Sequence, residues 1–143
     1  MKSIIKTITL LSLLMLASSA VFAQAERRTV IDIPFAFHVG EKTLPAGQYR
    51  IEPNRRDSDK VWVIRRTDNS AGTVVMANQT WSNKVPESAQ LIFHRYGDQY
   101  FLSQVWTAGA NAGIELPITR QERAVEVAST DKRETYLLTA SRD

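Results

Sequence analysis

Residues 91–106, LIFHRYGDQYFLSQVW, form the stretch that decides the fold. Two runs rich in aromatic and aliphatic residues flank Gly97-Asp98. Glycine suits the first central position of a tight II′ turn, because φ is positive there. The stretch is therefore predicted to be a β-hairpin in which Tyr96 lies opposite Gln99.

The turn also predicts which side chains share a face of the hairpin. Counting back from the turn gives one more apolar face, with the pairs Arg95 and Tyr100, Phe93 and Leu102, Leu91 and Gln104, and Ala89 and Trp106. The other face is mixed in polarity and carries Gln90 with Val105, Ile92 with Ser103, and His94 with Phe101. On this mixed side we predict the candidate ligand-binding residues His94, Tyr96 and Phe101.

Working outward, the rest of the chain reads as short strands separated by turns. Pro34 interrupts the first of these strands, which predicts an edge strand or a bulge there. Thr119 and Glu122 have the spacing of a capping box, so residues 120–128 are predicted to be a short helix. With the hairpin, about seven strands indicate an all-β antiparallel sandwich or flattened barrel; the additional strands are residues 29–39, 48–52, 61–66, 73–81 and 134–140.

The N-terminus has the pattern of a secretory signal peptide. Lys2 and Lys6 precede a short apolar run over residues 8–16, and small residues follow it. Cleavage is expected after Ala23, with Ala25 as the alternative. The expected organisation is a signal peptide over residues 1–23 and a single β domain over residues 24–143. The apolar run is too short for a typical transmembrane helix, so no membrane span is expected after processing.

Composition narrows the chemistry further. The chain has no cysteine, so disulfides, thiol chemistry and thiolate metal sites are excluded. Removing Lys2 and Lys6 from the 18 basic residues leaves 16 against 15 acidic ones, a formal charge of +1. A nearly neutral domain gives little support for nucleic acid as a partner.

Candidate catalytic and metal-binding groups are few. The two histidines, His38 and His94, fall short of the three or four ligands of a zinc site, so neither a metal nor a cofactor is expected. No serine lies in a nucleophile-elbow motif, and only the proximity of Ser103 to His94 on the hairpin would favour a hydrolase. The aromatic residues could instead form a platform for glycans or apolar ligands, although core packing is the favoured interpretation; they include Trp62, Trp81, Trp106, Tyr49, Tyr96 and Tyr100.

Four blocks of sequence in this order resemble a group of small exported proteins of unknown function from soil bacteria. The blocks are Ile33-Pro34-Phe35-Ala36-Phe37, Leu44-Pro45-Ala46-Gly47-Gln48-Tyr49, Phe93-His94-Arg95-Tyr96-Gly97-Asp98 with Tyr100-Phe101-Leu102, and Glu115-Leu116-Pro117 with Glu122. The resemblance spans nearly the whole mature chain. It implies an exported β domain and carries over no activity or binding residue.

These observations favour an exported, non-enzymatic β domain with a binding or structural role in the periplasm, elsewhere in the cell envelope, or outside the cell. A small-molecule or glycan-binding β-barrel is the first alternative, and a small hydrolase is the second. The expected partner is a protein or another envelope component. The charged loop over residues 53–60 and the small-residue segment over residues 108–113 are the predicted contact surfaces.

Overall fold

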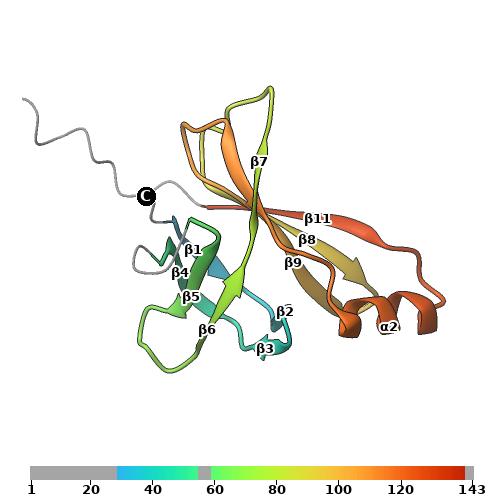
Figure 1. Ribbon diagram of the computed structural model, residues 1–143. Helices are drawn as coiled ribbons and strands as arrows, with labels where there is room; N and C mark the ends of the chain where they lie inside the picture. The colour runs from blue at the N-terminus through green and yellow to red at the C-terminus, as the bar shows by residue number, and fades with distance from the viewer. Residues whose placement is uncertain (1–28, 55–58, 141–143) are drawn as a thin grey trace, which may run out of the picture.

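A computed structural model describes residues 29–54 and 59–140 of the 143-residue chain. These residues form two β-sheets and one short helix, as Figure 1 shows, so the predicted all-β, sandwich-like fold is confirmed. The predicted signal peptide lies outside the described residues, and so does the centre of the charged loop, residues 55–58.

Sheet A is antiparallel and has the strand order β1-β4-β5-β6. Its members are β1 (Thr29–Ile33), β4 (Gly47–Pro53), β5 (Val61–Arg66) and β6 (Gly72–Met76). Each strand alternates between the interior and solvent, as the burial of Ile31 and Ile33 around the exposed Asp32 illustrates.

Sheet B has the order β11-β8-β9-β10-β7. It comprises β7 (Asn78–Trp81), β8 (Gln90–Tyr96), β9 (Gln99–Trp106), β10 (Ala112–Glu115) and β11 (Glu134–Thr139). The short strand β2 (Phe37–Val39) pairs with β9 in parallel and with β3 (Lys42–Leu44) antiparallel. Helix α2 (Arg120–Ala128) has the predicted bounds.

The described residues contain eleven strands rather than about seven. Two predicted strands each divide and pass from one sheet to the other, at Pro34–Ala36 between β1 and β2 and at Ala77 between β6 and β7. The interruption at Pro34 is therefore confirmed. The short strands β3 and β10 were not predicted, and β10 makes residues 112 and 113 part of sheet B rather than of a flexible segment. Strand β10 pairs with both β9 and β7, whereas the described partner of β3 is the neighbouring strand β2.

The β8–β9 hairpin keeps the predicted turn and half of the predicted register. Gly97 has a φ of 57°, and Phe93 pairs with Leu102. Between Ile92 and Phe93 the register shifts by one residue, because β9 contains a bulge. Beyond it, Val105 rather than Gln104 lies opposite Leu91.

The shift corrects the expected position of Trp106. It pairs with Gln90 rather than Ala89 and lies outside the main core cluster, where Val105 takes its place. A one-residue shift moves every later side chain to the opposite face. Trp106 is still buried, because its ring packs on Gly113 in the neighbouring strand β10.

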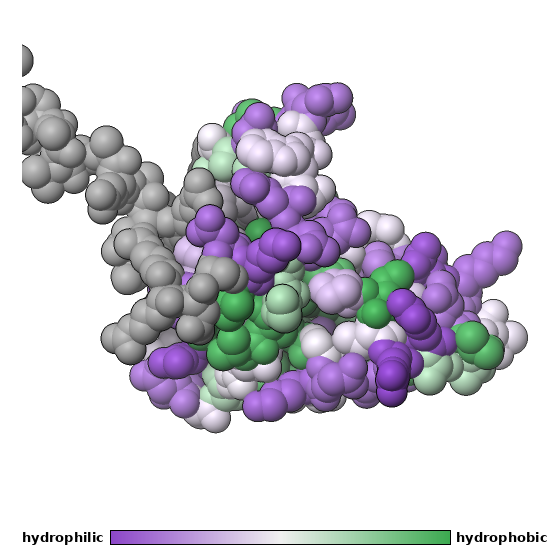
Figure 2. All heavy atoms as spheres, in the orientation of Figure 1, coloured by the Kyte–Doolittle hydropathy of each residue, from purple (hydrophilic) through white to green (hydrophobic). Residues whose placement is uncertain are grey.

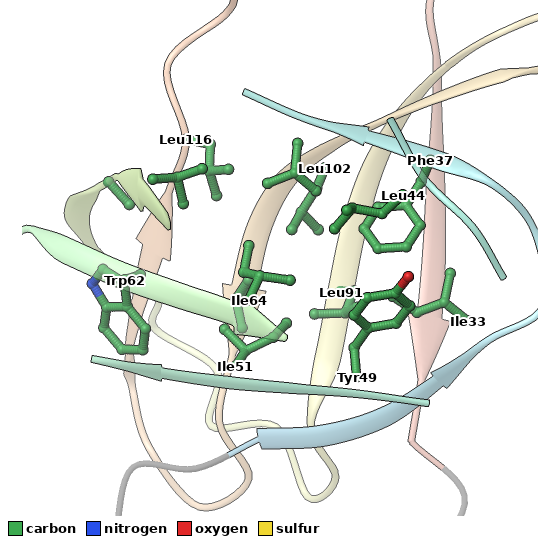
Figure 3. Close-up of a cluster of buried hydrophobic side chains, with 14 of the residues drawn as sticks. Ile33, Phe37, Leu44, Tyr49, Ile51, Trp62, Ile64, Leu91, Leu102 and Leu116 are labelled. Carbon is green, nitrogen blue, oxygen red and sulfur yellow. The ribbon is translucent and has the colours of Figure 1, made fainter. Parts of the chain in front are cut away.

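Side chains from both sheets fill the interior between them (Figure 3). Phe37 packs edge-on against Tyr49 of sheet A at 5.1 Å and against Phe93 of sheet B at 5.8 Å, measured between ring centroids. The Tyr49 hydroxyl donates a hydrogen bond to the Pro45 carbonyl at 2.6 Å, so this large side chain is buried without an unsatisfied polar atom. The largest fully buried side chains are Tyr49, Phe37, Phe93, Ile33, Ile51, Ile64, Leu91 and Val39.

The contact between Gly113 and Trp106 gives a direct test of the observed register. A Cβ atom at position 113 would lie 2.6 Å from the Trp106 ring and 2.8 Å from the Val105 carbonyl oxygen. Gly113→Ala should therefore lower the free energy of unfolding by about 1–3 kcal/mol, the usual cost of overpacking. Chemical denaturation measures this change. An unfolding curve identical to wild type would contradict the packing of Trp106 on β10.

Candidate functional site

The three predicted ligand-binding residues lie together at the turn end of the β8–β9 hairpin. His94 pairs with Phe101 across the two strands, and the rings of Tyr96 and Phe101 meet edge-on at 5.8 Å. Tyr96 and Phe101 are each only 2% exposed, whereas the His94 side chain is 20% exposed. The hairpin thus brings the three residues together, but two of them are closed to solvent.

Glu122 of helix α2 joins this group. Its Oε1 atom lies 2.6 Å from His94 Nδ1 and accepts a hydrogen bond from the Tyr96 hydroxyl at 3.3 Å. Glu122 is the buried residue of α2, with 4% exposure. Most surface helices dock through an apolar stripe. Here a carboxylate holds the helix to sheet B, and its hydrogen bonds compensate for its burial.

Sequence reasoning recognised Glu122 only as a capping residue. Thr119 is the N-cap of α2, as predicted, and its hydroxyl accepts a hydrogen bond from the Glu122 backbone N–H at 3.1 Å. The Glu122 side chain reaches across to the hairpin. The available signal was the absence of an apolar stripe in residues 120–128, since such a helix needs another means of attachment.

Burial changes the acidity of two groups in this region. It raises the pKa of the Tyr96 hydroxyl, and the nearby carboxylates of Glu122 and Glu126 raise it further, with Arg133 opposing them. It lowers the pKa of His38, whose ring stacks on Phe101 with centroids 4.4 Å apart, while a hydrogen bond with Gln99 opposes the change. Both shifts favour the neutral form.

The His94–Glu122 pair resembles the base and orienting acid of a catalytic triad in its geometry alone. Within the described residues His94 forms no hydrogen bond to Ser103, which is itself buried. The Ser103 carbonyl accepts a hydrogen bond from the Leu116 N–H instead. The observed contacts of His94 and Glu122 therefore account for the attachment of α2.

The predicted aromatic platform is dispersed through the fold. Trp62 lies in the core, Trp106 packs on Gly113, and Trp81 is largely exposed on β7. One of the predicted residues, Tyr100, belongs to an aromatic group that packs against the core: Phe35 stacks on Tyr100 at 3.9 Å and meets Tyr136 edge-on at 5.4 Å. Across the described part of the chain, no group of three or more His, Asp or Glu residues could hold a metal ion.

A row of exposed apolar side chains lies on the outside of sheet A. Val74 is 58% exposed and Met76 66% exposed, and hydrophobic atoms gather over β5 and β6 in Figure 2. Cationic side chains border this row on the same face of the sheet. We call this surface the cationic-aliphatic face and define it by Arg50, Val61, Val63, Arg65, Val74 and Met76.

A shallow hollow of about 640 Å³ lies at one end of this face. Lys42 and Arg65 line it together with Val63, Val74 and the β5–β6 turn. Gly72 lies directly opposite Arg65 and has no side chain to cover the Arg65 stem. Sequence analysis missed this surface because β5 carries apolar residues at both alternating positions, Trp62 and Ile64 inward and Val61 and Val63 outward.

Comparisons with protein-family models, curated proteins and solved structures found no match to this chain. In the part of the chain that the structure describes, no helix has the length and apolar character needed to cross a membrane.

The attachment of α2 can be tested by neutralising its buried carboxylate. Glu122→Gln should lower the free energy of unfolding by about 1–3 kcal/mol, because the charge-assisted hydrogen bonds to His94 and Tyr96 are weakened. Amide hydrogen exchange in α2 should become faster. Glu126→Gln is the matched control, since Glu126 is exposed and pairs with Arg133 at 3.7 Å. Equal effects of the two variants would argue against a special role of Glu122.

The His38 environment predicts a specific pH dependence. Its folded-state pKa lies below the ordinary 6.5, so the unfolded chain takes up this proton more readily. Stability is therefore retained above pH 6.5 and falls as the pH drops through the folded-state pKa. NMR titration of the His38 ring, assigned with His38→Gln, measures that pKa directly. A titration midpoint at or above pH 6.5 would refute the claim that burial lowers the pKa of His38.

Proposed function

We propose that the protein is an exported, non-enzymatic β domain that holds a partner in the cell envelope or outside the cell through the cationic-aliphatic face. The observation that carries this proposal is the exposure of Val74 and Met76 on an edge strand above a filled interior. Contiguous exposed apolar surface is a mark of interaction sites. The export part of the proposal comes from the signal-peptide pattern of residues 1–23.

The filled interior supports a surface function over a barrel that encloses a ligand. Side chains such as Phe37, Tyr49 and Phe93 occupy the space between the sheets. Small-molecule sites are usually concave pockets of a few hundred cubic ångströms that surround the ligand. The hollow beside Arg65 is open and shallow, which suits a polypeptide partner better than an enclosed small molecule.

Glycan binding is the second candidate, and the exposed parts of Tyr100 and Tyr136 would provide it. Phe35 already stacks on one ring face of Tyr100, and Arg95 lies 5.5 Å from the centroid of the same ring. Tyr136 packs edge-on against Tyr100 at 5.4 Å. Because these rings already pack against each other, they are better explained as part of the core packing than as a platform for a sugar.

Site-specific photo-crosslinking in the cells that naturally produce the protein tests the proposal. A crosslinking residue at Met76 should give a discrete adduct, because this side chain lies in the cationic-aliphatic face. The same residue at Val127 of α2 is the matched control, since Val127 is 88% exposed but outside that face. The intact mass of the exported protein should correspond to a chain that starts at Gln24.

Two results would contradict the proposal. Adducts of equal yield at positions 76 and 127 would remove the cationic-aliphatic face as the specific binding surface. An unprocessed chain retained in the cytoplasm would refute export. Processing after Ala25 instead of Ala23 would correct the cleavage position and leave export intact.

A further inference from the structure

We propose that edge strand β6 pairs with an extended, acidic strand of a partner polypeptide, which continues sheet A. This inference rests on the proposed function and specifies the chemistry of the partner. Among the described strands, only β5 is hydrogen-bonded to β6, so β6 is an edge strand of sheet A. The free edge of a strand offers backbone N–H and C=O groups to an added strand.

The register of sheet A determines what the added strand would meet. On the outer face, β6 places Gly72 opposite Arg65, Val74 opposite Val63, and Met76 opposite Val61. Each of these pairs forms a row that ends at the free edge. Two rows are therefore aliphatic, and the third ends in a glycine that leaves Arg65 accessible from the edge.

The charge of the third row favours an anionic group. Arg50 lies directly opposite Arg65 on β4, and like charges in this arrangement destabilise a sheet. Within the described residues neither arginine is within ion-pair distance of a carboxylate. Asp32 and Glu52 lie on the same face but are opposite Gln48 and Val63, and Lys42 adds a further positive charge to the hollow. A carboxylate beside Gly72 would neutralise this cluster.

Together these rows specify a pattern for the partner. An antiparallel strand would present an aliphatic residue beside Met76, another beside Val74 two residues later, and an acidic residue beside Gly72 two residues after that. A second copy of this chain does not fit through its own β6, because Gly72–Met76 has no acidic residue. Pairing of two β6 strands would leave Arg65 of both copies unneutralised.

A capped, fluorescein-labelled peptide, Ser-Thr-Val-Thr-Val-Thr-Glu-Thr-Ser, serves as the probe. Fluorescence anisotropy should show binding to the processed domain, weaker at high salt. Replacing the glutamate of the peptide by glutamine should weaken binding about fivefold, the effect of a partly exposed ion pair. Arg65→Gln in the protein should cause the same loss for the glutamate peptide and almost none for the glutamine peptide.

Two controls isolate the surface and the mode of binding. Arg123→Gln removes an exposed arginine from α2 and should leave peptide affinity unchanged. A peptide in which proline replaces the threonines between the valines and the glutamate should not bind, because proline is incompatible with regular strand pairing. Hydrogen exchange should show new protection at the β6 amides when the original peptide is bound.

The inference is overturned if the glutamate peptide does not bind, if Arg65→Gln affects both peptides equally, or if the proline peptide binds as well as the original. Arg65-dependent binding to phosphatidylglycerol vesicles in place of the peptide would also overturn it, in favour of a lipid surface. A crosslinked adduct at position 76 without peptide binding would refute pairing with an acidic strand but leave the proposed function standing. If neither an adduct nor peptide binding is found, the proposed function and the strand pairing are both refuted.

Discussion

The edge-on packing of Phe37 between Tyr49 and Phe93 is the contact on which the rest of the structure depends. Phe37 belongs to a three-residue strand that follows the break at Pro34, yet it touches the centre of both sheets. Aromatic side chains bury large areas, and their edge-on pairs add to that gain. These rings fill part of the space between the two sheets, within the core cluster.

The outer faces of the two sheets differ in composition and in their contacts within the described residues. On sheet B, hydrogen bonds from the hairpin to the Glu122 carboxylate attach a helix that lacks an apolar stripe. On sheet A, the outer face carries aliphatic side chains on the edge strand β6 and two arginines opposite each other. Like charges opposite each other disfavour the isolated sheet, and the proposed partner would bring a carboxylate to Arg65. The contrast between the two faces is the physical basis of the proposed function.

Local pattern was sufficient to predict much of the fold. The turn at Gly97, the break at Pro34 and the Thr119 cap all follow from backbone preferences of single residues, and the structure has each of them. Most of the strands were predicted from a different signal, the alternation of side chains between the interior and solvent. The bulge in β9 was not predictable in this way, because nothing local distinguishes Ser103 from an ordinary strand residue. Its consequence was an incorrect face for Trp106.

The candidate sites depend on contacts between distant parts of the chain. Glu122 meets His94 across 28 residues, and the pairing of Arg50 with Arg65 requires the β4–β5 register. Neither contact could be predicted from local sequence.

The central claim is that a partner binds the cationic-aliphatic face while the interior between the sheets stays filled. Methyl NMR of the processed domain, free and bound to the partner captured at position 76, tests it most directly. The account predicts shifts at Val63, Val74 and Met76 and unchanged signals from Ile64 and Leu91. Large shifts confined to the interior methyl groups would contradict it.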